Sequence, residues 1–220
     1  MKRIPSLIVF SLTLLLSIGL WFVFGGREAL ASEAGVKPEY GLMLRSFCLG
    51  AGFMLVEVAL LQRFVLLLGH PVYSLTVTLF SLLLGTGAGS FFSRTFAADQ
   101  VRRRLVRALL GIIVVAGIGI LVLPPLITAV IQTPRAARVV LAILILVPAG
   151  ALMGIPLPAG VRLLSAGQPS LVPWAWGMNG ALSVMGATLA VFIAMNWGFS
   201  VTLATGALVY LLAAALVARA

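Results

Sequence analysis

Long apolar runs separated by short polar stretches set the pattern of this chain. A helix needs about 20 predominantly apolar residues to cross the hydrocarbon core of a bilayer. Runs of about this length cover residues 4–24, 40–68, 72–92, 108–131, 139–164, 174–197 and 201–217. The pattern predicts an all-α fold: a polytopic membrane helix bundle of about seven transmembrane helices, in a single transmembrane domain over residues 1–220.

The first run has two interpretations. Its basic start at residues 2–3, the apolar residues 4–24 and an Ala-Leu-Ala sequence at 29–31 have the order of a signal peptide with its cleavage site. The apolar core of such a peptide has only about 7–15 residues, which favours a retained helix or signal anchor here. A polar linker over residues 25–39 then leads into the helical bundle proper, residues 40–217.

The run over residues 139–164 contains Pro156 and Pro158 between two glycines. Each proline removes an N–H donor and clashes with the preceding turn, so the sequence predicts a break or kink here. Non-helical backbone at membrane depth is tolerated where protein or a wet cavity covers it. No earlier run has a matching interruption, so the inverted repeat of many transporters is not visible in the sequence.

The composition excludes a soluble protein. Hydrophobic residues make up 62% and charged residues only 9% of the chain, whereas a soluble domain has about 25% charged residues. The 15 Lys and Arg against 5 Asp and Glu give a net charge of +10. Because the basic residues lie between apolar runs, we interpret them as a positive-inside signal. Their expected partners are anionic lipid headgroups and not nucleic acid.

The basic residues do not fix one orientation. With seven spans, one side of the membrane collects five of them and the other collects ten, including the arginines of an expected basic loop over residues 94–107. The larger group favours a cytoplasmic position for residues 102–104 and a cytoplasmic C-terminus. The basic residues 2–3 favour the opposite orientation for the first helix, so the side of the N-terminus stays open.

Glu57 lies near the middle of the run over residues 40–68. A charged side chain at that depth costs about 2.5–3.5 kcal/mol on insertion scales, and it supports a functional-site hypothesis. The hypothesis is a proton or cation site inside the bundle. The structural alternative is a protonated Glu57 that donates a hydrogen bond to a neighbouring helix, for instance to Asn179 or to a carbonyl group at the proline break.

Gln62, Arg63 and His70 lie toward one end of the same run. They either line a polar vestibule, in which His70 changes its charge near neutral pH, or Arg63 snorkels to the interface while the other two cap helix ends. The chain has one His and one Cys, which speaks against a zinc site of the usual composition. We therefore expect no metal, no cofactor and no catalytic residue.

Gly85 and Gly89 belong to a glycine-rich stretch, residues 85–90, that superficially resembles a nucleotide-binding loop. Such a loop follows a strand and opens a helix, whereas this stretch closes an apolar run and precedes arginines. The four-residue spacing of the two glycines predicts close helix packing instead.

Three stretches of the chain carry a family resemblance. Residues 52–90, together with residues 153–164 and 172–191, resemble the membrane portion of bacterial spermidine-synthase-like multi-pass membrane proteins. The resemblance implies a multi-pass protein of the bacterial inner (cytoplasmic) membrane, without the aminopropyltransferase-like domain of that family. With 5 acids in all, the chain has no position that matches a catalytic residue of the family. A protein partner that carries the soluble enzyme domain would complete such a system.

Two functions follow as expectations. The first is a non-catalytic anchor, scaffold or subunit of a spermidine-synthase-like system, which the short loops and the missing enzyme domain favour. The alternative is a small transporter or permease-like bundle for a small solute, cation- or proton-coupled, with Glu57, Asn179 and the proline break around a central site. The resemblance suggests polyamines as the transported substrate. The apolar runs contain only one acidic residue, however, which argues against a multiply cationic solute. An intramembrane enzyme is the weakest hypothesis, because no nucleophile–base pair is visible.

The polar groups also predict a packing arrangement. An unpaired polar group in apolar surroundings costs several kcal/mol, so Glu57 needs a polar partner. We expect the run over 40–68 to pack against the proline break and the start of the run over 174–197. Glu57 would then face the bundle interior, within reach of a polar group of another helix.

Overall fold

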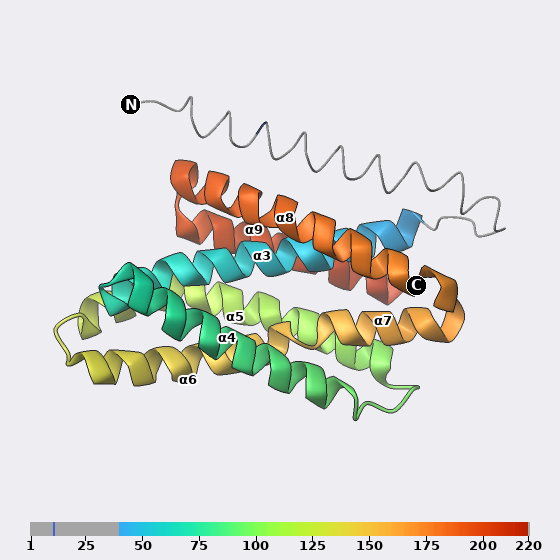
Figure 1. The fold of residues 1–220 in the computed structure, drawn as a ribbon, viewed down its shortest axis with the longest axis horizontal. Coiled ribbons are helices and arrows are strands. Elements are labelled where there is room, and N and C mark those ends of the chain that lie inside the picture. Colours follow the sequence, from blue (N-terminus) through green and yellow to red (C-terminus); the bar gives the residue numbers. More distant parts are fainter. Residues whose placement is uncertain (1–10, 12–39, 220) are drawn as a thin grey trace.

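The computed structural model describes residue 11 and residues 40–219, with side chains from residue 48 onward in the latter range (Figure 1). Its elements are α3 (Tyr40–Leu68), α4 (Pro71–Ser93), α5 (Val101–Val130), α6 (Arg135–Met153), α7 (Pro156–Gly167), the 3₁₀ turn η1 (Pro169–Leu171), α8 (Val172–Trp197) and α9 (Phe199–Arg219). The prediction of an all-α helix bundle is confirmed. Of the predicted first helix, residues 4–24, only residue 11 lies among the described residues.

Six stretches of the described chain are long and apolar enough to cross a membrane. They are Cys48–Leu68, Pro71–Ser93, Val101–Val130, Arg135–Gly167, Pro169–Trp197 and Phe199–Arg219. They correspond to the six predicted runs that lie within the described residues. The chain therefore has the fold of a multi-pass membrane protein.

One predicted boundary is wrong. The sequence predicts a basic loop before a helix that starts at residue 108, but α5 begins at Val101. The arginines of residues 102–107 are therefore part of its first two turns. Arginine is a good helix former, and Arg104 donates two hydrogen bonds of 3.2 and 2.9 Å back to the side chain of Gln100. Helical structure thus continues beyond the apolar run at this end.

The predicted break at the two prolines is present. α6 ends at Met153 and α7 begins at Pro156. The turn between them is closed locally, because the Gly154 N–H donates a 2.8 Å hydrogen bond to the Gly150 carbonyl. The two helices together make one stretch of membrane-spanning length, Arg135–Gly167.

Contacts between helices define the order of the bundle. α3 runs parallel to α8, and α4 runs parallel to α6, whereas α9 is antiparallel to both α3 and α5. The main neighbours of α3 are α8 and α9 (Figure 1). The end of the bundle at which α4 ends and α5 begins is called the arginine end, because residues 94–107 and Arg162 place their arginines there. The opposite end, at which α3 ends and α4 begins, is called the His70 end.

Small residues let two pairs of helices approach until their backbones touch. A Cβ added to Gly186 of α8 would lie 2.6 Å from the Cα of Ala51 in α3. A Cβ added to Gly150 of α6 would lie 2.6 Å from the Leu82 carbonyl oxygen in α4. Such contacts are typical of membrane helices, whose association depends on van der Waals packing. Buried apolar side chains of α3, α5 and α9 fill the centre of the bundle.

Candidate functional site around Glu57

Glu57 lies in the middle of the α3 span, where it is half-buried. The preceding Val56 packs against Gly206 of α9, and the following Val58 packs against a small apolar cluster that α3 and α8 form. The fully buried Tyr210 of α9 lies within electrostatic range of the Glu57 carboxyl group. Within the described part of the chain, Glu57 forms no hydrogen bond and no ion pair. The polar group that the structure associates with Glu57 therefore belongs to α9.

Asn179 lies at a different level of α3. A Cβ added to Gly50 would be 2.6 Å from the Asn179 carbonyl oxygen and 3.1 Å from its side-chain Oδ1. Gly50 precedes Glu57 by about 10 Å along the helix axis, at 1.5 Å per residue. The Asn179 carbonyl also accepts a 2.7 Å hydrogen bond from the Ser183 hydroxyl. The start of α8 thus packs on α3. Asn179, however, lies about two helical turns from Glu57, for which the sequence analysis names it as a possible hydrogen-bond partner.

Arg63 reaches across to the start of α9. Its guanidinium group donates a hydrogen bond to the Ser200 hydroxyl and lies 6.0 Å from the centroid of the Phe199 ring. Gln62 is half-buried, and His70 is exposed at the N-cap position of α4, where its side chain makes no capping hydrogen bond. No hydrogen bond joins any two of the five predicted site residues, all of which lie in the described part of the chain.

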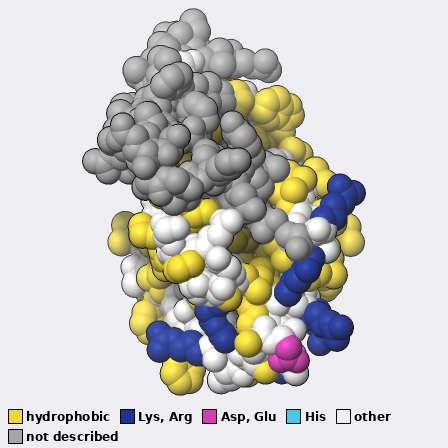
Figure 2. Space-filling model, turned by 90° about the vertical axis from the view of Figure 1, so that its right-hand side faces the viewer, with side chains coloured by type: hydrophobic (Ala, Val, Ile, Leu, Met, Phe, Trp, Pro, Cys, Tyr) yellow, Lys and Arg dark blue, Asp and Glu magenta, His cyan; other side chains and the backbone are white. Residues whose placement is uncertain are grey.

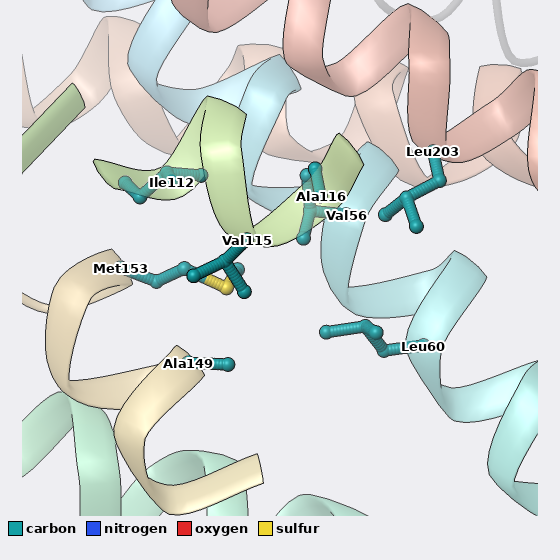
Figure 3. Close-up of a pocket in the computed structure, with 8 residues that line it drawn as sticks. All are labelled: Val56, Leu60, Ile112, Val115, Ala116, Ala149, Met153 and Leu203. Atoms are coloured by element: carbon teal, nitrogen blue, oxygen red, sulfur yellow. The ribbon is translucent and has the colours of Figure 1, made fainter. Parts of the chain in front are cut away.

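An apolar cavity lies beside the proline break (Figure 3). Its volume is about 20 Å³, and the side chains that line it come from α3, α5, α6 and α9: Val56, Leu60, Ile112, Val115, Ala116, Ala149, Met153 and Leu203. This volume has room for about one water molecule, but a buried water needs polar partners that this lining does not offer. Glu57 does not belong to the lining. The space next to the break therefore suits an apolar group and not a charged or polar solute.

Three buried polar atoms toward the His70 end have no hydrogen-bond partner among the described residues. They are the hydroxyl oxygens of Ser74 and Thr78 in α4 and the Nε atom of Arg138 in α6. Ser74 and Thr78 are fully buried, on the face of α4 that also places Gly85 and Gly89 against α6. Their four-residue spacing within an apolar run is a signal in the sequence that could have revealed this buried polar face.

Three arginines bind backbone carbonyl groups at the C-terminal ends of other helices, where the carbonyls have no partner within their own helix. The pairs are Arg162 with Ser93 (2.8 Å), Arg138 with Leu67 (2.8 Å) and Arg102 with Ala218 (2.7 Å). These contacts fix the ends of α4, α3 and α9. Each joins residues that are far apart in the chain, so the sequence pattern gives no sign of them.

Metal-binding side chains do not gather in the described part of the chain. No group of three or more His, Cys, Asp or Glu residues there has the arrangement to hold a metal ion. Comparisons of the chain with protein-family models, with curated proteins and with solved structures find no match. We therefore infer a function from the packing and the charges of the bundle.

Proposed function

We propose that the chain is a non-catalytic membrane module, an anchor, scaffold or subunit, of a spermidine-synthase-like system. One observation carries this proposal: the cavity at the proline break is apolar and has a volume of only about 20 Å³. A pocket that holds a small ligand usually measures about 300–1,000 Å³ and offers a few convergent polar groups. Among the described residues, the cavity at the proline break is therefore too small and too apolar for a central solute site, which favours a protein that positions a partner.

The helix contacts support the same function. Backbone contacts at Gly186 and Gly150 hold α3 to α8 and α4 to α6, and the arginine–carbonyl pairs fix the ends of three helices. A bundle held in this way is expected to keep one arrangement, as a scaffold requires. The assignment to a spermidine-synthase-like system rests on the resemblance of residues 52–90, 153–164 and 172–191.

We further propose that the arginine end faces the cytoplasm of a bacterial cell and that the membrane is the inner one. The described arginines at that end are Arg94, Arg102, Arg103, Arg104, Arg107, Arg162 and Arg219, whereas Arg63, Arg135 and Arg138 lie toward the His70 end. Figure 2 shows this end, with Lys and Arg side chains spread among apolar ones. Cytoplasmic loops carry an excess of basic residues. The C-terminus and a partner with a soluble enzyme domain would then lie on the cytoplasmic side.

Isolation of the tagged full chain in a mild detergent, followed by native mass spectrometry, tests the scaffold function. We expect a complex of fixed stoichiometry with a protein that carries an aminopropyltransferase-like domain. The control is a tagged multi-pass protein of unrelated sequence, produced at the same level in the same membrane. A lone monomer, both in detergent and in particles that retain native lipid, contradicts the proposal.

A small transporter is the second candidate, and the surroundings of Glu57 favour it. A half-buried carboxyl group in mid-span, without a hydrogen bond or ion pair in the described part of the chain, is typical of a proton or cation pathway. Uptake of small cations into proteoliposomes is compared between the wild type, Glu57→Gln and the control Asp99→Asn, which removes an exposed acid at the arginine end. Flux that falls only in Glu57→Gln supports transport. Equal flux in all three removes Glu57 from the mechanism, and absence of flux supports the scaffold.

A further inference from the structure

The outward face of α5 changes from apolar to basic along its length. Its exposed apolar side chains recur at three- or four-residue spacing: Leu110, Val114, Ile118 and Leu121. These four residues are called the α5 stripe, and they are 45% to 75% exposed. The same spacing, continued toward the N-terminus, reaches Arg107 and Arg103, which are also exposed and are called the arginine pair. The α5 stripe and the arginine pair therefore lie on one face of the helix.

The α5 stripe has the length of one bilayer leaflet. Leu110 and Leu121 are about 16 Å apart along the helix axis, at 1.5 Å per residue. The hydrocarbon core of a bilayer is about 30 Å thick, so the stripe covers about half of it. Arg107 lies about one turn before Leu110. The arginine pair is thus placed at the depth of lipid headgroups when the stripe contacts acyl chains.

The arginine pair differs from neighbouring arginines in having no protein partner among the described residues. Arg102 donates two hydrogen bonds to carbonyl groups of α9, at 3.0 and 2.7 Å. Arg104 donates to the Gln100 side chain and lies 4.8 Å from the centroid of an aromatic ring. As far as the described residues show, the guanidinium groups of Arg103 and Arg107 are therefore available to a ligand outside the protein.

The position of the arginine pair in α5 also favours an anion. The N-terminal end of a helix carries a partial positive charge, so cations there destabilise the helix and anions stabilise it. The first turn of α5 has no acidic residue, and Gln100 makes no capping hydrogen bond with its side chain. An anion beside Arg103 would reduce both the repulsion between the arginines and their repulsion from the helix end.

We propose that the outer face of α5 binds an anionic glycerophospholipid. The lipid phosphate lies between Arg103 and Arg107, and an acyl chain lies along the α5 stripe. A lipid fits better than a free phosphate, because the basic pair and the apolar stripe share one face and meet at headgroup depth. The site is a surface of the bundle itself, so it is independent of the scaffold function.

Native mass spectrometry of the delipidated full chain in detergent tests this site. Phosphatidylglycerol and phosphatidylcholine with identical acyl chains are added in equal amounts, and their adducts are compared. We expect the wild type to favour phosphatidylglycerol by about twenty-five-fold, because each of the two arginines near an anionic lipid raises the affinity by about fivefold. The double variant R103Q/R107Q should lose this preference. The control R94Q/R219Q removes the same number of charges at the arginine end, away from the α5 stripe, and should retain it.

Three results overturn the proposal. If R103Q/R107Q prefers phosphatidylglycerol as strongly as the wild type, or if the control loses the preference equally, binding follows net charge and not this site. If glycerol 3-phosphate displaces phosphatidylglycerol at equal concentration, the site takes a free phosphate. As an independent readout, phosphatidylglycerol should raise the melting temperature of the wild type and of R94Q/R219Q, but not that of R103Q/R107Q.

Discussion

Gly186 in α8 lies against Ala51 in α3 so closely that a Cβ atom on the glycine would be 2.6 Å from the alanine Cα. Real Cβ atoms essentially never approach another heavy atom to that distance. The contact matters for the candidate site, because α3 also carries Glu57 and its most extensive contact among the described helices is with α8. The backbone contact at Gly186 therefore helps to set the position of Glu57 in the bundle.

We predict that Gly186→Ala pushes α8 away from α3 and destabilises the bundle by about 1–3 kcal/mol, the usual cost of overpacking. Gly180→Ala, in the same helix, is the matched control, because no described atom lies within 4 Å of its added Cβ. It should be neutral or slightly stabilising, since alanine favours a helix over glycine by about 1 kcal/mol. Unfolding in detergent, followed by tryptophan fluorescence, measures both. Equal changes in stability for the two variants would show that the backbone contact between α3 and α8 does not determine the stability of the bundle.

The contact between α4 and α6 gives a second pair of variants. A Cβ on Gly89 would lie 3.0 Å from the Cα of Ala151 and closer still to its carbonyl group, whereas a Cβ on Gly87 meets no described atom within 4 Å. We predict that Gly89→Ala lowers the melting temperature, with a destabilisation of about 1–3 kcal/mol, and that Gly87→Ala does not. If Gly87→Ala destabilises as much, the effect comes from the loss of glycine in α4 and not from packing against α6.

Arg162 links α7 to the end of α4 and to the loop that follows it, because its guanidinium donates to the carbonyls of Ser93 and Phe96 at 2.8 and 3.0 Å. Hydrogen bonds to charged groups contribute about 1.5–3 kcal/mol each when a partner is removed. We predict that Arg162→Gln destabilises the protein by about 2 kcal/mol and increases proteolysis between residues 94 and 100. The control Arg94→Gln removes an exposed arginine from the same loop, and its effect should stay within about 0.5 kcal/mol. Similar proteolysis of both variants would contradict a capping role for Arg162.

Local sequence signals predicted most of the fold. The long apolar runs predicted the membrane-spanning helices, and the Pro156–Pro158 pair predicted the break that follows Met153. The start of α5 was missed because loss of apolar residues marks the edge of the hydrocarbon core and not the end of a helix. Arginine is compatible with helical structure, so α5 extends beyond the apolar run as far as Val101.

The candidate site was less predictable, because its contacts depend on which helices are neighbours. Arg63 binds Ser200, 137 positions later in the chain, and Glu57 lies within electrostatic range of Tyr210. The Arg63–Ser200 hydrogen bond and the proximity of Glu57 to Tyr210 both require α9 to lie against α3, which no local pattern indicates. Asn179 was a reasonable partner for Glu57 by polarity alone, but the parallel packing of α3 and α8 places it beside Gly50.

The last prediction concerns Glu57, because a neutral and a charged side chain at its position should have different effects on the stability of the bundle. Glu57→Gln keeps the size and polarity of the side chain without a charge, so we predict a melting temperature equal to or above that of the wild type. Glu57→Lys keeps a charge in mid-span and should cost about 2.5–3.5 kcal/mol on insertion. A double-mutant cycle with Tyr210→Phe measures the coupling to α9, and the effect of Tyr210→Phe should shrink in the Glu57→Gln background. A marked loss of stability in Glu57→Gln would instead show that the bundle requires the carboxyl group itself.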